Sequence, residues 1–109
     1  MKSADDAQTK VFHALADPSR RAIFEALTGG EAAVKDLTAR FEISQPAVSQ
    51  PLAILKDAGL VNARREGRLV YYRVEPSGVT PLIDWIAYHR AFWTQRVERL
   101  EQLLEKMDS

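Results

Sequence analysis

The sequence predicts a mainly α-helical domain with one small β-hairpin and a long C-terminal helix. Three patterns support this prediction: apolar residues spaced three and four apart behind helix-start signals, extended runs rich in Val and Tyr, and a heptad-like apolar series near the end. The chain has 109 residues, of which 46% are hydrophobic and 28% charged. This size and composition are typical of one globular domain, so we assign residues 1–109 to a single domain.

The first part of the chain predicts two helices. A helix over about residues 4–16 follows from apolar residues on one helical face, namely Val11, Phe12 and Leu15. Asp17 is suited to cap a second helix, and Pro18 suits its first turn because the missing N–H costs nothing there. Gly29–Gly30 ends this helix, since glycine adopts the left-handed conformation that is common at helix C-termini.

The next segment predicts two helices separated by a tight turn. The third helix covers about residues 34–41, and Ser44 caps the fourth, over about residues 45–58. Segment 44–55 contains no charged residue. It divides into a polar side with Ser44, Gln45, Ser49 and Gln50, and an apolar side with Val48, Leu52 and Leu55. This pattern predicts an exposed face that offers hydrogen bonds without charge.

A β-hairpin with a basic tip is predicted after Gly59. Residues 61–65 and 68–74 are two extended runs joined at Glu66–Gly67. The chain as a whole is neutral, with 15 basic and 15 acidic residues. Segment 61–73, however, has a positive net charge, because it contains one glutamate and four arginines: Arg64, Arg65, Arg68 and Arg73. An anionic partner is therefore expected at this local patch.

Thr80–Pro81 begins a last helix over about residues 81–107. A heptad-like seam, apolar except for one histidine, follows in steps of three and four residues: Ile86, His89, Trp93, Val97, Leu100, Leu104 and Met107. A helix of about 26 residues is roughly 39 Å long, which is more than a domain of this size covers with its own core. We expect part of the stripe to meet a second chain. Its aromatic residues favour packing there over a ligand pocket, which stays an alternative.

Helices followed by a hairpin with a basic tip are the element order of a winged helix-turn-helix. Residues 34–58 are then the helix-turn-helix and residues 61–74 the wing. Gln pairs bidentately with adenine and Ser bonds to several bases, whereas arginines neutralise phosphates. Double-stranded DNA is therefore the predicted partner, and the predicted DNA-binding set is Ser44, Gln45, Ala47, Ser49, Gln50, Arg64, Arg65 and Arg68.

Three stretches resemble one known family. FHALADPSRRAIFEAL, ISQPAVSQPLAILKDAGLV and GRLVYYRV look like the ArsR/SmtB family of winged-helix repressors. The resemblance implies a homodimer of the first and last helices, residues 1–16 and 81–107, that binds an imperfect palindrome near its own promoter and blocks transcription until a signal releases it. The interface residues are then Phe12, Leu15, Ile86, His89, Trp93, Val97, Leu100 and Leu104.

The sequence departs from the metal-sensing members of that family. Their third helix carries a motif like E-L-C-V-C-D-L, where this chain has EAAVKDL, so Ala33 and Lys35 occupy the thiolate positions. Their last helix carries D-x-H with a later His and Glu, whereas here His89 follows Asp84 by five residues. The chain has no cysteine, which also removes a redox switch. We expect no metal and no cofactor, and leave an organic effector open.

Pro51 stands in the fourth helix where the family usually has His. An interior proline costs roughly 3 kcal/mol and kinks a helix. The recognition helix is therefore expected either to bend there or to present a reoriented contact face. This residue motivates an alternative function, a winged-helix dimer that has lost DNA reading and binds proteins or small molecules.

Other function classes have no support in the sequence. No Ser/His/Asp spacing, phosphate-binding loop or carboxylate pair indicates an enzyme. No stretch approaches the roughly 18 apolar residues of a membrane span, and the N-terminus lacks the apolar segment of a signal peptide. We expect a cytoplasmic, homodimeric, sequence-specific transcriptional regulator, in the first instance a repressor that senses no metal.

Overall fold

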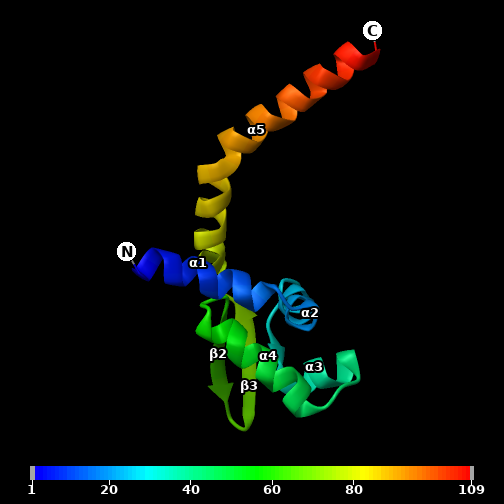
Figure 1. The fold of residues 1–109 in the computed structure, drawn as a ribbon. Helices are drawn as coiled ribbons and strands as arrows, with labels where there is room; N and C mark the ends of the chain where they lie inside the picture. The colour runs from blue at the N-terminus through cyan, green and yellow to red at the C-terminus, as the bar shows by residue number, and fades with distance from the viewer. Residues whose placement is uncertain (1, 109) are drawn as a thin grey trace.

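The computed structural model describes residues 2–108, with side chains from Asp6 onward. Figure 1 shows a helical body beside a hairpin, with the last helix rising from it as a long arm. In chain order the elements are α1 (Lys2–Leu15), α2 (Pro18–Leu27), β1 (Ala32–Ala33), α3 (Val34–Phe41), α4 (Gln45–Asp57), β2 (Val61–Glu66), β3 (Leu69–Val74), the 3-10 helix η1 (Pro76–Val79) and α5 (Thr80–Asp108). The predicted helices and the hairpin are confirmed, and β1 and η1 are additions.

Local capping contacts explain where the helices begin. The Asp17 carboxylate accepts a hydrogen bond from the Arg20 amide at 3.0 Å, and Pro18 occupies the first turn of α2. The Ser44 hydroxyl accepts from the Ala47 amide at 3.3 Å at the start of α4. Between α3 and α4, Glu42 takes a left-handed conformation with φ 55°. This residue closes the tight turn that the sequence predicted.

The core lies between α1, α2, α3, α4 and the start of β2. Its apolar side chains are at most 2% exposed: Val11, Ala14, Ile23, Leu27, Leu37, Val48, Leu52, Leu55, Leu60 and Val61. Burial of each larger side chain contributes about 1.5–3 kcal/mol. The inward face predicted for the fourth helix is confirmed. Because that face of α4 is fully used, the opposite face must point outward.

The hairpin belongs to a three-stranded antiparallel sheet of order β1-β3-β2. β1 has two alanines, Ala32 and Ala33, which pair with Tyr72 and Tyr71 of β3. The sequence did not predict β1 because two small residues have neither the length nor the alternation of a strand. The pairing joins the hairpin to the segment that leads into α3.

The turn of the hairpin lies one residue later than predicted. Glu66 pairs with Leu69, so Gly67 and Arg68 form the turn and β3 begins at Leu69. Gly67 has φ 62°, a conformation that favours glycine. Arg68 therefore stands at the tip of the wing and not within a strand. Together these elements form the predicted winged helix-turn-helix fold.

The helix α5 has 29 residues and none of them is buried. It contacts α1 near its start, where the rings of Phe12 and Trp85 lie 5.5 Å apart, edge to face. The rest of α5 extends away from the body, as Figure 1 shows. No helix within residues 2–108 is long and apolar enough to cross a membrane.

Candidate nucleic-acid interface

The outward face of α4 carries polar groups without charge. Gln45, Ala47 and Gln50 are exposed and Ser49 is half-buried, whereas Val48 is fully buried behind them. Ser44 is exposed but its hydroxyl already caps the helix. The arrangement presents two glutamine amides and the Ser49 hydroxyl to a partner, which suits hydrogen bonding to base edges.

The wing places cations beside that face. Arg65 and Arg68 are exposed near the hairpin turn. In the part of the chain that the structure describes, neither guanidinium has a hydrogen bond or ion pair. Their charges are therefore available to phosphates in solution.

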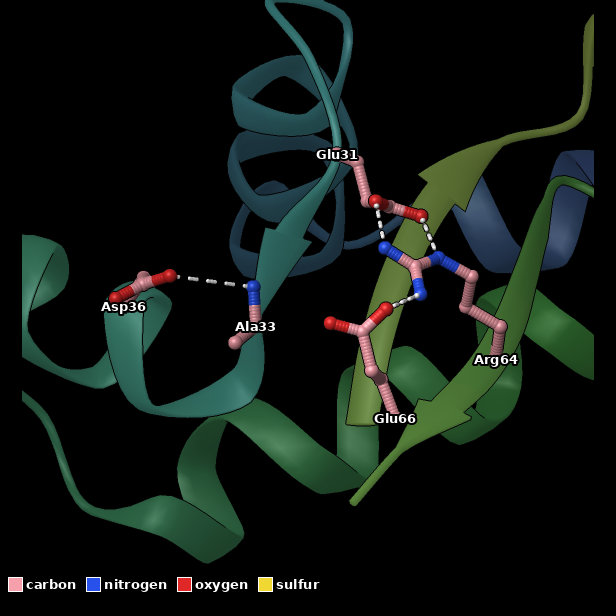
Figure 2. Close-up of polar contacts among 5 residues, drawn as sticks. All are labelled: Glu31, Ala33, Asp36, Arg64 and Glu66. Carbon is pink, nitrogen blue, oxygen red and sulfur yellow. Dashed lines mark hydrogen bonds and ion pairs between the residues drawn. The ribbon is translucent and has the colours of Figure 1, made fainter. Parts of the chain in front are cut away.

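Arg64 differs from its two neighbours because each of its three guanidinium nitrogens donates a hydrogen bond to a carboxylate (Figure 2). Its Nε and Nη2 donate to the two carboxylate oxygens of Glu31 at 2.8 and 2.7 Å, and its Nη1 donates to Glu66 at 2.8 Å. The guanidinium carbon also lies 4.6 Å from the centre of the Tyr71 ring. The sequence assigned Arg64 to the DNA-binding set, and the structure gives it these protein partners instead of an open charge.

The pKa values of this pair move in the directions that a strong ion pair requires. The hydrogen bond from Arg64 lowers the pKa of the Glu31 carboxyl below its usual range. The bonds to Glu31 and then to Glu66 raise the pKa of the Arg64 guanidinium. Both groups are thus charged across the whole physiological range. Sequence reasoning missed Glu31, because it lies 33 positions away from Arg64 in the chain.

A groove of about 300 Å³ separates the wing from the helix-turn-helix. It brings together Gln45 of α4 and Arg68 of the wing, two residues of the predicted DNA-binding set. Lys35 and Thr38 of α3 line the same groove, and neither was predicted from the sequence to bind DNA. The signal that could have found them is an exposed lysine at the start of the helix that precedes the predicted turn.

Comparison with known proteins bears on this arrangement directly. The profile of a helix-turn-helix domain family matches residues 15–64. Transcriptional repressor SdpR of Bacillus subtilis is 37% identical over 76 residues, which are 70% of this chain and 84% of SdpR. A transcriptional repressor of Synechocystis, described as an SmtB homologue, is 44% identical over 80% of this chain and 67% of its own length. The chain belongs to the ArsR/SmtB family.

A solved structure of a possible ArsR-family regulator shares this fold. It is the solution structure of the homodimeric winged helix-turn-helix DNA-binding domain of a possible ArsR-family regulator from Mycobacterium bovis. The TM-score is 0.63 at 34% identity, over 79% of this chain and 82% of the other. The relatives named here are two transcriptional repressors and a possible transcriptional regulator.

Ala33 and Lys35 stand where the metal-sensing motif E-L-C-V-C-D-L has its two cysteines, and neither side chain can bind a metal ion. Ala33 is buried and contributes only a methyl group, while Lys35 is exposed and cationic. On α5, the centre of the His89 ring lies 4.5 Å from that of Trp85, at a tilt of 45°, and 4.9 Å from that of Tyr88, edge to face. Within residues 2–108, no three His, Cys, Asp or Glu residues gather closely enough to hold a metal ion.

The residues that the sequence assigned to a subunit interface form an exposed seam in this ArsR/SmtB chain. Phe12 is 38% exposed, Leu15 and His89 are half-buried, and the remaining five are more than half exposed: Ile86, Trp93, Val97, Leu100 and Leu104. Their side chains run along α5 and onto α1 at the Phe12–Trp85 contact. An apolar face of this extent is unusual on a surface that stays in water.

Proposed function

We propose that this chain is a homodimeric, sequence-specific DNA-binding repressor of its own or an adjacent promoter, built as one winged helix-turn-helix domain per subunit. The observation that carries the proposal is the neutral polar face of α4 beside the open charges of Arg65 and Arg68. Hydrogen-bonding groups distinguish bases, and cations hold phosphates. The two kinds of group lie next to each other, on the elements that a winged helix-turn-helix brings to DNA.

In this proposal α4 enters the major groove. Gln45 and Gln50 each offer an amide that pairs with the adenine edge, and the Ser49 hydroxyl adds a contact that is less selective. Ala47 is exposed between them and suits apolar contact with a thymine methyl group. Ser44 takes part chiefly by fixing the start of the helix. Arg65 and Arg68 set the register by holding the backbone.

The dimer follows from the seam on α5. Apolar side chains that are exposed along a helix of 29 residues need a partner, and a second copy of the chain offers the same seam. The homodimer of the related Mycobacterium bovis domain supports this assignment. Two copies of α4 related by a two-fold axis read an imperfect palindrome whose half-sites lie about one helical turn apart, roughly 34–36 Å.

The proposed repressor does not respond to metal. Ala33 and Lys35 offer no ligand at the positions of the family's thiolates, and the chain has no cysteine. In this proposal, either an organic effector releases the protein from DNA or the protein has no effector. Zn²⁺ added in excess to the protein–operator complex is expected to leave its affinity unchanged within about twofold. A loss of about tenfold or more would contradict this part of the proposal.

A fluorescence-anisotropy titration tests the function. The purified protein is titrated onto a duplex from immediately upstream of its own coding region and onto a scrambled duplex, at about 50 and about 200 mM salt. We expect binding at least about 10³-fold tighter to the upstream duplex and a clear loss of affinity at the higher salt. Equal affinity for the two duplexes at both salt concentrations would contradict sequence-specific binding near this promoter. It would favour the alternative that Pro51 motivates, a dimer that binds proteins or small molecules.

A further inference from the structure

The contact between Arg64 and Glu31 spans the whole sheet of the wing. Arg64 lies in β2 and Glu31 directly precedes β1, and these two strands are separated by β3. Tyr71 of β3 opposes Arg64 on one side and Ala33 of β1 on the other. The guanidinium therefore crosses over the Tyr71 ring, 4.6 Å from its centre, to reach the Glu31 carboxylate. One side chain connects all three strands.

The connection continues into the helix-turn-helix. The Ala33 amide donates to the Asp36 carboxylate at 3.4 Å, which ties β1 to the first turn of α3 (Figure 2). Besides the contact of Arg64 with Glu31, the hairpin pairs with β1 at two positions within residues 2–108, Ala32 with Tyr72 and Ala33 with Tyr71. A short hairpin with so little pairing on one edge is marginal by itself. Its angle to α3 and α4 then depends on side-chain contacts.

We propose that Arg64 and Glu31 form a latch that sets the angle of the wing, so that Arg64 is a positioning residue and not a phosphate ligand. The proposal rests on the DNA-binding function proposed above. The latch holds the wing at the angle that brings Arg68 and Gln45 to the two sides of one groove. Glu31 and Glu66 already neutralise Arg64, so in this proposal Arg64 neutralises no phosphate and releases no counterion from the DNA.

Exposed ion pairs contribute little to stability, and both partners here are partly exposed, at 48% for the Arg64 side chain and 30% for that of Glu31. The bidentate geometry instead gives directional precision, because two parallel bonds fix the plane of the guanidinium. The latch therefore acts on DNA binding more than on the melting temperature. A contact with a purely structural role would instead change the melting temperature when it is removed.

The test compares Glu31→Gln and Arg64→Ala with Arg68→Ala, on the upstream duplex and over a range of salt. We expect Glu31→Gln and Arg64→Ala each to weaken binding by about three- to tenfold with an unchanged salt slope and an unchanged melting temperature. The double variant is expected to bind no more weakly than either single one. Arg68→Ala, the matched control, flattens the slope by about 0.9 for each phosphate that the protein no longer neutralises.

If Arg64 were a phosphate ligand, the Glu31→Gln variant would change DNA affinity in the opposite direction. If Arg64 bound a phosphate in competition with Glu31, Glu31→Gln would tighten binding and steepen the salt slope, and Arg64→Ala would flatten it. Either result would overturn the latch, as would an unchanged affinity in both variants. Hydrogen exchange of the β2 and β3 amides needs no DNA, so it tests the latch even where the proposed function fails. Both variants are expected to exchange faster there, and unchanged exchange would overturn the latch independently.

Discussion

The exposed side chain of Gln50 carries an amide and no charge, whereas that of Arg68 carries a charge at the tip of the wing. An amide discriminates between bases because its donor and acceptor both need a partner, and an unmatched base leaves one of them unsatisfied. A guanidinium on a phosphate is indifferent to sequence. Substitutions at the two positions therefore have different signatures, one in the preferred sequence and the other in the salt dependence.

Gln50→Ala is expected to cost about 1–3 kcal/mol of specific binding and to relax the preference at one base position of each half-site. Binding to a scrambled duplex should stay the same. A panel of duplexes with single base changes, read by anisotropy, checks both parts. Gln102→Ala, at an exposed position on the distant half of α5, is the matched control. An equal loss on specific and scrambled duplexes would show that Gln50 does not read a base.

Glu75 connects the end of β3 to the 3-10 turn through its carboxylate. Its Oε2 accepts from the Ser77 hydroxyl at 2.8 Å and from the Ser77 backbone amide at 3.3 Å, and its Oε1 accepts from the Asn62 side-chain amide. These bonds, the Ser77 hydroxyl first, hold the pKa of Glu75 below the ordinary value of 4.5. Since the folded-state pKa is the lower one, the stabilisation is fully present above the unfolded value and is lost as the pH falls through the folded value.

Glu75→Gln should therefore make the free energy of unfolding less dependent on pH below the ordinary glutamate pKa of 4.5. Urea unfolding at a series of pH values from neutral to about pH 3 measures this dependence. Glu98→Gln, on the far half of α5, is the control. The expectation fails if Glu75→Gln loses stability with acid as steeply as the unsubstituted protein does.

At the scale of elements, α4 runs as one helix from Gln45 to Asp57 and passes through Pro51. Proline has no amide to donate to the carbonyl of Ala47, four residues before it, and its ring crowds that carbonyl. Pro51→His should restore the bond and raise the melting temperature, since each 1 kcal/mol shifts it by roughly 4–8 °C in a domain of this size. Thermal unfolding followed by circular dichroism measures the shift. A lower melting temperature would show that the surroundings of Pro51 already compensate for it.

The helices and the hairpin were predictable because their signals are local. Asp17 and Ser44 cap the helices that follow them, and the buried face of α4 repeats at helical spacing. β1 was not predictable, because two alanines become a strand only through the partner that β3 offers. The exposed face of α4 was likewise readable from its period alone.

The protein partners of Arg64 were not all predictable either, because one of them is distant in the sequence. Glu31, the bidentate partner, comes near Arg64 only when β1 joins the sheet. The sequence does not distinguish the four arginines of the wing. In the fold, Arg64 has a bidentate carboxylate partner, whereas Arg65 and Arg68 have no ion pair within residues 2–108. A charge count predicts the sign of a patch and not which charges remain available.

At the scale of the whole molecule, the chain is elongated, with extents of 67 × 36 × 20 Å. Most of that length comes from α5, which at 1.5 Å per residue is about 43 Å long. Its large apolar side chains from Ile86 to Met107 are at least 46% exposed in the single chain. We interpret this helix as the dimerisation element, which sets the spacing between two copies of α4.

Leu100→Glu places a carboxylate in the seam of α5, where Leu100 is 56% exposed in the single chain. Each subunit of the dimer would then have to desolvate a charge, so we expect self-association to weaken by at least about tenfold. Sedimentation equilibrium measures the dissociation constant directly. Gln102→Glu adds the same charge off the seam and should leave the dimer intact. Equal association of the two variants would remove Leu100 from the interface.

The measurement that tests the central claim most directly is hydroxyl-radical footprinting of the protein on the duplex upstream of its coding region. A dimer that reads DNA with two copies of α4 should protect two half-sites whose centres lie about 10–10.5 base pairs apart, or a multiple of that spacing, on one face of the duplex. Gln50→Ala should weaken both protected regions together. A single protected half-site, or uniform protection along the duplex, would contradict recognition of a palindrome by this dimer.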